Sequence, residues 1–218
     1  MTEKGTVRVR VWDGPTRIAH WMMVLLFGAS WWTGETGRLE WHRWSGYVFL
    51  GVLVFRIWWG FFGSSTARFS QFLRGPRSIF AYLRGRWPLA PGHNPLGALS
   101  VFALLLLLVA QVVFGLFAVD TDGIESGPLS THVSFDTGRR FAGLHDLTFN
   151  LLLVLVSLHV LAVGFYVLVK KQNLIGAMFG GTRSYDSRPA EPVRFASWAR
   201  IILGIVIAAA IAWYLSRD

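Results

Sequence analysis

The histidines are the residues of this 218-residue chain that best suit redox or metal chemistry, because the chain has no cysteine. Without cysteine it can form no disulfide, no thiolate-bound iron–sulfur cluster and no covalently attached haem c. Four of the six histidines lie in or at the ends of long apolar stretches: His20, His42, His145 and His159. An ionisable residue inside a membrane is costly and is a functional candidate by default. We expect the other two, His93 and His132, in loops.

The spacing of the four histidines suits two haem groups at two depths. His145 and His159 are 14 residues apart, which is close to four helical turns, so they share one helix face about 21 Å apart along its axis. A haem iron takes one axial imidazole from each side. His20 matches the depth of His159, and His42 matches that of His145. We therefore predict two b haems, ligated by His20 with His159 and by His42 with His145.

Anionic haem propionates need basic partners, and several arginines are placed to provide them. Arg56 follows His42 by 14 residues, so it faces the same way at the depth of the inner haem, where a propionate would explain a charge inside an apolar stretch. Gly46 follows His42 by one turn and would leave room for a porphyrin. Further propionate candidates, by their closeness to the histidines, are Arg17, Arg43, Arg139 and Arg140.

The apolar stretches predict an all-α membrane protein. Hydrophobic residues make up 53% of the chain and the mean hydropathy is +0.46. About 20 apolar residues are needed to cross a bilayer. We therefore predict five transmembrane helices. The five stretches are Ile18–Thr33, Trp41–Phe62, Leu96–Val119, Phe141–Val169 and Trp198–Leu215.

The net charge of +9 reflects membrane topology, because the basic residues lie between the apolar stretches. We expect no nucleic-acid partner. Of the 21 lysines and arginines, fifteen fall on the side that holds the N-terminus and five on the other, with Arg56 inside a stretch. The positive-inside rule then places the N-terminus in the cytoplasm.

A specific combination of motifs covers about residues 8–185. It comprises Trp12-Asp13, the run Pro15–Trp21 around His20, His42 with Gly46, the run Arg56–Gly60, the loop Gly92–Pro95 and the His145/His159 pair. In these motifs the sequence resembles the bacterial cytochrome b561 family and the related b-type cytochrome subunits of membrane-bound nickel–iron hydrogenases. The fifth stretch is similar to an extra helix in longer members.

This resemblance implies an all-α membrane protein in the bacterial inner membrane, with a four-helix transmembrane bundle that holds two bis-histidine b haems within residues 1–185. A linker and a fifth transmembrane helix would follow within 186–218. The resemblance also implies the same two histidine pairs. It also implies electron exchange between quinone and an outer, periplasmic redox partner such as a hydrogenase or a c-type cytochrome. We expect the outer segment Asp120–Arg140 to be an exposed docking loop. His93 is a candidate for contacting quinone.

Two alternatives stay open. One is an enzyme that oxidises superoxide at the outer haem and reduces quinone, which would need a basic funnel, whereas the outer segments are rich in acids. The other is a membrane anchor or transporter without redox chemistry, in which the histidines form a proton relay or hydrogen bonds between helices. The direction of electron flow and the formation of a homodimer are also left open.

Overall fold

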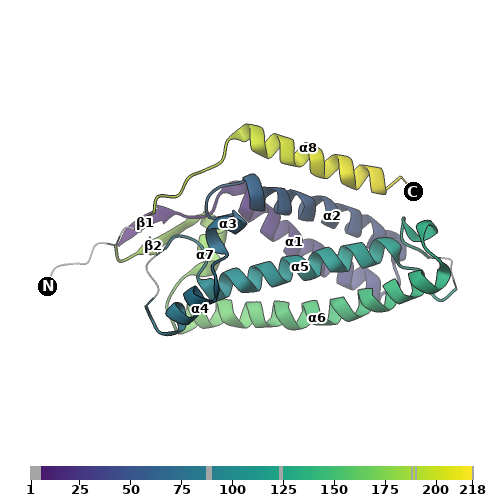
Figure 1. Ribbon diagram of the computed structural model, residues 1–218, viewed down its shortest axis with the longest axis horizontal. Helices are drawn as coiled ribbons and strands as arrows, with labels where there is room; N and C mark the ends of the chain where they lie inside the picture. Colours follow the sequence, from purple (N-terminus) through teal and green to yellow (C-terminus); the bar gives the residue numbers. More distant parts are fainter. Residues whose placement is uncertain (1–5, 87–89, 123–124, 188, 190, 218) are drawn as a thin grey trace. The chain divides into compact units, whose positions relative to one another are not determined.

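The computed structural model describes residues 6–86, 90–122, 125–187, 189 and 191–217, and these are mostly helical (Figure 1). They fall into two compact units. The described residues of unit 1 lie within Met1–Ile18, Ile57–Phe102 and Leu158–Ile202, and those of unit 2 lie within Ala19–Arg56, Ala103–Ser157 and Leu203–Asp218. The long helices contribute residues to both units: α1 (Gly14–Glu35), α2 (Leu39–Phe62), α5 (Pro95–Phe117), α6 (Phe135–Leu168) and α8 (Trp198–Leu215).

Four of the described helices are long and apolar enough to cross a membrane: α2, α5, α6 and α8. The chain is therefore a multi-pass membrane protein, as its hydropathy predicts. Helix α1 has 22 residues but is not among these four described candidates, so its crossing of the membrane, and with it a fifth span, stays a prediction. The division into 1–185 and 186–218 also stays a prediction.

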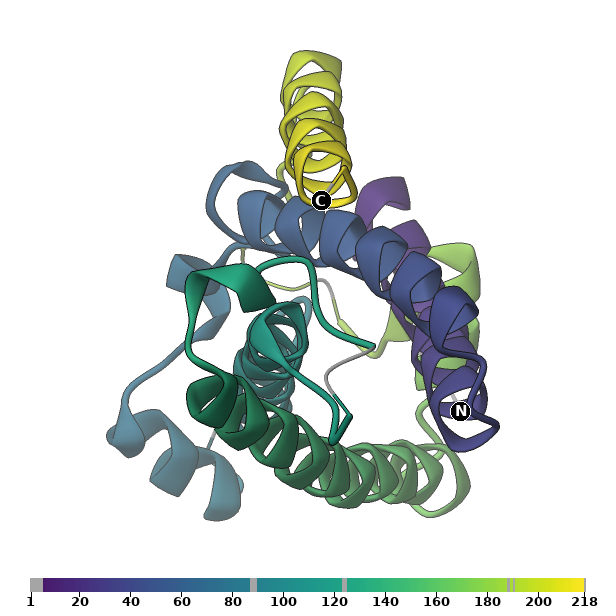
Figure 2. The same cartoon turned by 90° about the vertical axis from the view of Figure 1, so that its right-hand side faces the viewer.

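Unit 2 is built from segments of five helices: α1, α2, α5, α6 and α8. Figure 2 looks onto the end of the structure at which α1 ends and α2 begins. The hydroxyls of Ser30 on α1 and Ser45 on α2 lie 2.8 Å apart in a hydrogen bond. Helix α8 approaches α2 at Gly51, where an added Cβ would lie 3.5 Å from the Cβ of Ala212 and 3.8 Å from the carbonyl oxygen of Ala208. Small residues of this kind let membrane helices pack closely.

The segment between α5 and α6 covers the end of α5. The N–H of Gly127 donates to Ala118 O at 2.8 Å and that of Leu129 to Leu116 O at 2.8 Å, which satisfies carbonyls that a helix end leaves unpaired. The prediction of a loop throughout Asp120–Arg140 was wrong in two places. A 3-10 helix, η1, spans Ser130–His132, and α6 already begins at Phe135; residues 123–124 lie outside the described part.

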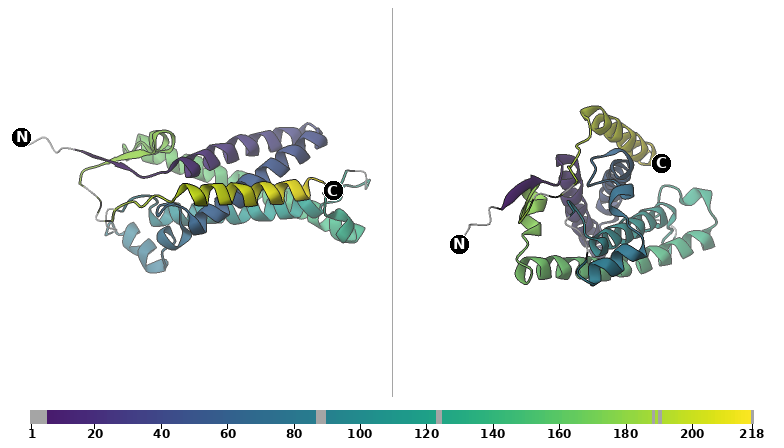
Figure 3. Two further views of the ribbon diagram at one scale, coloured as in Figure 1. Left: turned by 90° about the horizontal axis from the view of Figure 1, so that it is seen from above. Right: turned by 60° about the vertical axis from the view of Figure 1, so that its left-hand side comes forward.

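Unit 1 contains a small antiparallel strand pair that joins distant parts of the sequence. Strand β1 (Val7–Arg10) pairs with β2 (Thr182–Tyr185), with Val7 opposite Tyr185, and the two lie side by side in both views of Figure 3. Between α6 and β2 lies α7 (Leu174–Gly180), and its Ala177 packs with Val11, Trp12 and Tyr185 in a buried core. Two short helices, α3 (Phe69–Phe72) and α4 (Pro76–Leu83), follow α2.

Asp13 links the start of α1 to the end of α2 within unit 1. Its Oδ1 accepts a 2.8 Å hydrogen bond from the N–H of Thr16, as in a helix N-cap. Its Oδ2 accepts one of 2.9 Å from the indole N–H of Trp59, which is 1% exposed. The carboxylate is itself buried, so these two bonds compensate for its removal from water.

Candidate functional site

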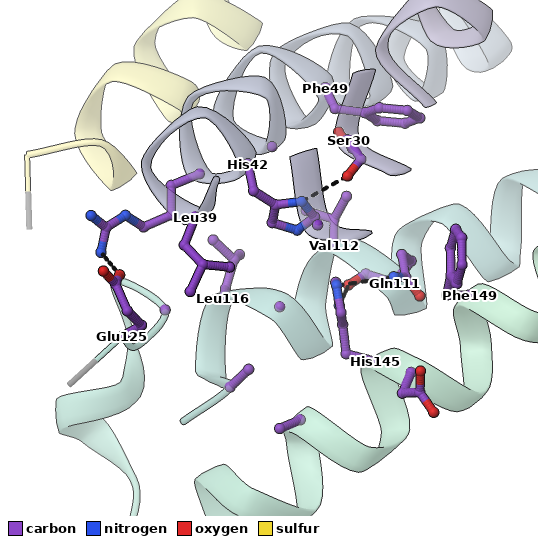
Figure 4. Close-up of a pocket in the computed structure, with 18 of the residues that line it drawn as sticks. Ser30, Leu39, His42, Phe49, Gln111, Val112, Leu116, Glu125, His145 and Phe149 are labelled. Carbon is purple, nitrogen blue, oxygen red and sulfur yellow. Dashed lines mark hydrogen bonds and ion pairs between the residues drawn. The ribbon is translucent and has the colours of Figure 1, made fainter. Parts of the chain in front are cut away.

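Unit 2 holds a cavity of about 470 Å³ whose walls come from α1, α2, α5, α6 and the segment after α5. His42 of α2 and His145 of α6 both line it, and Figure 4 shows their rings turned toward one another. The ring centroids are 6.1 Å apart and the ring planes are 82° apart. The structure thus brings together two histidines that are 103 residues apart in sequence.

Backbone carbonyls orient both imidazoles. Nδ1 of His42 lies 2.9 Å from Ser30 O, and Nδ1 of His145 lies 2.8 Å from Gln111 O. A carbonyl can only accept, so Nδ1 is the protonated nitrogen in each ring. Nε2 then keeps its lone pair, which is the arrangement found in metal-ligating histidines.

The distance between the rings fits a shared metal atom. An imidazole–metal bond is about 2 Å long and the ring centre lies roughly 1 Å behind the nitrogen, so two rings on one metal have centres about 6 Å apart. A Cβ added at Gly46 would meet nothing within 4 Å, although Gly46 lines the cavity, so this glycine leaves open space beside the rings. The volume lies within the range of roughly 300–1,000 Å³ that cofactor pockets occupy. The residues therefore fit a haem held between His42 and His145.

Gln111 is a site residue that the sequence reasoning missed. Its side-chain amide nitrogen lies 3.0 Å from Nε2 of His145, and the hydroxyl of Thr148 donates to its side-chain oxygen. Binding of a metal at Nε2 requires this amide to turn away, while the carbonyl contact to Nδ1 can stay. The sequence does hold one sign of this residue, because a polar side chain within α5, the most hydrophobic candidate span, is a functional candidate.

The charges at the cavity are mainly acidic. Arg43 forms an ion pair with Glu125, with 2.9 Å between Nη1 and Oε2, and both side chains are about 40% exposed. Arg43 is therefore at the cavity but bound to a carboxylate. Arg140 is exposed and is not among the described residues that line the cavity. Three further acids line the cavity: Glu35, Asp120 and Asp146.

The other predicted ligands fall in different units. His20 belongs to unit 2 and His159 to unit 1, and their pairing stays a prediction. Arg17 donates to two backbone carbonyls of unit 1, Asp13 O at 3.3 Å and Phe179 O, so its guanidinium supports the fold there. Arg56 is 4% exposed, and its pairing with a propionate stays a prediction.

The two remaining histidines lie outside the first cavity. His132 ends the 3-10 helix. His93 is in a loop, as predicted, where its ring centroid lies 4.7 Å from that of Trp12 and 4.9 Å from that of Phe72. It lines a second cavity, in unit 1.

A multi-pass helical protein with facing intramembrane histidines is typical of membrane b-type cytochromes, and the comparisons with known proteins agree. Residues 11–181 match the family model of prokaryotic cytochrome b561. The chain belongs to this family. It is also 27% identical, over an alignment 218 positions long, to a protein named probable Ni/Fe-hydrogenase B-type cytochrome subunit from Azotobacter chroococcum mcd 1; the match covers 83% of this chain and 91% of that relative. No solved structure gives a significant match.

The family membership assigns haem b as the cofactor and membrane electron transfer as the role. It argues against the alternative of an anchor or transporter without redox chemistry.

Proposed function

We propose that the chain carries two b haems and passes electrons between quinone in the bacterial inner membrane and an outer redox partner. The observation that carries this proposal is the facing pair His42 and His145, whose separation of 6.1 Å suits two imidazoles on one iron. The second haem rests on the predicted pair His20 and His159. A bis-histidine haem supplies a one-electron redox centre without an open position for oxygen.

The residues around the cavity hold the imidazoles and place aromatic rings in the same cavity. The carbonyls of Ser30 and Gln111 fix the orientation of the two rings. Aromatic side chains of three helices line the cavity, and apolar surroundings of this kind are one means by which a protein sets a redox potential. These aromatic residues are Phe27, Phe49 and Phe149.

The proposed partner is a hydrogenase in preference to a c-type cytochrome, because the Azotobacter relative is named as a hydrogenase subunit. The proposed orientation has the N-terminus in the cytoplasm, and the distribution of basic residues supports it. The segment after α5 then lies outside. Its Asp120 and Glu125 line the cavity, and acids on this side of the membrane would attract a basic partner surface.

Superoxide oxidation is a weaker second candidate. Arg43 and Glu125 neutralise one another in an ion pair, and an anionic substrate would then meet the three further acids that line the cavity. Such a field repels an anion and slows its association. The charges of the cavity therefore favour electron relay over direct chemistry on superoxide.

Reduction by quinol tests the proposal. The full chain is purified in mild detergent, mixed anaerobically with a water-soluble quinol, and followed at the haem absorption bands. We expect both haems to be reduced in the unaltered protein, and only one to remain in His42→Ala. His132→Ala, an exposed histidine outside the cavity, is the matched control and should behave as the unaltered protein.

Haems that stay oxidised with quinol but are reduced by dithionite would contradict quinone as the exchange partner. A well-folded protein without haem absorbance would contradict the whole proposal.

A further inference from the structure

The second cavity lies in unit 1 at the ends of three apolar helices. It has a volume of about 370 Å³ and is lined by residues of three segments. Residues 65–74 follow the end of α2 at Phe62, residues 90–93 precede the start of α5 at Pro95, and residues 191–194 precede the start of α8 at Trp198. All three helices are candidate membrane spans. The cavity therefore lies where apolar chain gives way to polar chain, at the depth of lipid headgroups.

Tertiary hydrogen bonds hold these segments together. The N–H of Ser65 donates to Arg194 O at 2.9 Å, and the N–H of Arg194 donates back to the Ser65 hydroxyl at 3.0 Å. The hydroxyl of Thr66 donates to Val11 O at 2.7 Å. The cavity is thus part of the fold of unit 1 and not a gap between loose loops.

The lining is strongly basic. Arg68, Arg74 and Arg194 line the cavity with a single acid, Glu191. Among the described residues, the ion pair within 4 Å is Arg43 with Glu125, in unit 2, so the three arginines have no carboxylate partner in the described part of the chain. The Nε of Arg68 donates to Gly63 O at 2.8 Å, which anchors its guanidinium. Guanidinium groups match phosphate oxygens in geometry and charge.

We propose that this cavity binds the phosphate of an anionic phospholipid headgroup. Three cations against one acid favour an anion over a neutral or zwitterionic ligand. A membrane source is favoured because the helix ends next to the lining segments carry exposed apolar side chains: Phe62, which ends α2, is 47% exposed, and Trp198, which begins α8, is 79% exposed. Basic pockets at membrane helix ends are known to hold anionic headgroups. Free phosphate shares the chemistry, and the test separates the two sources.

The test measures binding of dioctanoyl phosphatidylglycerol to the purified full chain in detergent. Parallel titrations use dioctanoyl phosphatidylcholine and inorganic phosphate. Each basic residue near a membrane surface contributes to the free energy of binding an anionic lipid. Arg74→Gln and Arg194→Gln should therefore each weaken phosphatidylglycerol binding about fivefold. Combined with Arg68→Gln the loss should be roughly 100-fold. Arg77→Gln on α4, which is exposed and does not line the cavity, is the matched control and should change binding less than about twofold.

Arg68→Lys keeps the charge and should bind within about fivefold of the unaltered protein, which covers the case in which Arg68→Gln fails to fold. Three results would overturn the proposal. Equal weakening by Arg77→Gln would mean diffuse surface attraction, and equal binding of phosphatidylcholine would mean apolar contact alone. Competition by inorganic phosphate at the same concentration as the lipid would mean a site for a free anion.

Discussion

Gly115 sets the space available to the imidazole of His145, and its replacement by alanine is the sharpest perturbation of the cavity. A Cβ at this position would lie 2.9 Å from Cε1 and 3.1 Å from Nδ1 of His145. Carbon atoms in contact prefer about 3.5–4.0 Å, so the ring must move by roughly 0.5 Å or more. That movement should distort the 2.8 Å hydrogen bond between Nδ1 of His145 and Gln111 O.

The effect on overall stability should be small. Overpacking of a tight site costs about 1–3 kcal/mol, and replacing a glycine inside a helix by alanine returns up to about 1 kcal/mol. The free energy of unfolding should therefore fall by about 0–3 kcal/mol, which most folded membrane proteins survive. The displaced ring, however, should ligate iron poorly, so the spectrum is the informative measurement.

The assay is the haem content and the low-spin optical and EPR spectra of Gly115→Ala, measured beside Gly143→Ala. Gly143 is on α6, does not line the cavity, and an added Cβ there meets nothing within 4 Å. We expect Gly115→Ala to lose the haem of this cavity or to convert it to a high-spin form, and Gly143→Ala to match the unaltered protein. Full low-spin haem with an unchanged reduction potential in Gly115→Ala would refute the assignment of His145 as a ligand in this position.

Four other outcomes follow from the structure. Gly46→Leu should fill the open space beside the rings and remove one haem per chain in a haem count while the protein stays folded. The imidazole planes of the cavity, 82° apart, should give that haem a strongly anisotropic low-spin EPR signal; a rhombic signal typical of parallel planes would contradict the geometry. Asp13→Ala should destabilise unit 1 by about 2–4 kcal/mol in thermal unfolding, because it removes a helix cap and the carboxylate that accepts a hydrogen bond from the buried N–H of Trp59. Burial and the hydrogen bond with Tyr166 raise the pKa of Tyr82 from 10.0 to about 12. The stability that the protonated Tyr82 hydroxyl contributes is therefore complete below pH 10 and is lost as the pH rises toward 12. Tyr82→Phe should remove this loss of stability in unfolding measurements over a pH series.

Hydropathy predicted the apolar helices well and their polar ends poorly. The stretch Trp198–Leu215 coincides with α8, whereas α6 begins six residues before the predicted Phe141. The missed turns contain Asp136, Arg139 and Arg140, which lower the local hydropathy although they suit a helix end outside the bilayer. The pair β1–β2 was not predicted, because four-residue strands about 170 residues apart leave no periodic signal.

The site was predictable where it depends on side-chain type and spacing. The depth argument paired His42 with His145, and the structure places them across one cavity. The orienting groups are backbone carbonyls of Ser30 and Gln111, and any residue has a carbonyl, so no sequence pattern marks them. Charge alone suggested Arg43 as a propionate partner, which stays a prediction; the sequence did not show that an acid from a distant segment, Glu125, forms an ion pair with it.

The most direct test of the central claim is the number of haem b groups per chain and their loss in single histidine variants. The pyridine haemochrome assay gives the count, and a redox titration tells which haem remains. We predict two haems per chain, with His42→Ala and His145→Ala losing the same haem and His20→Ala and His159→Ala losing the other. One haem in the unaltered protein, or different haems lost from His42→Ala and His145→Ala, would contradict the account.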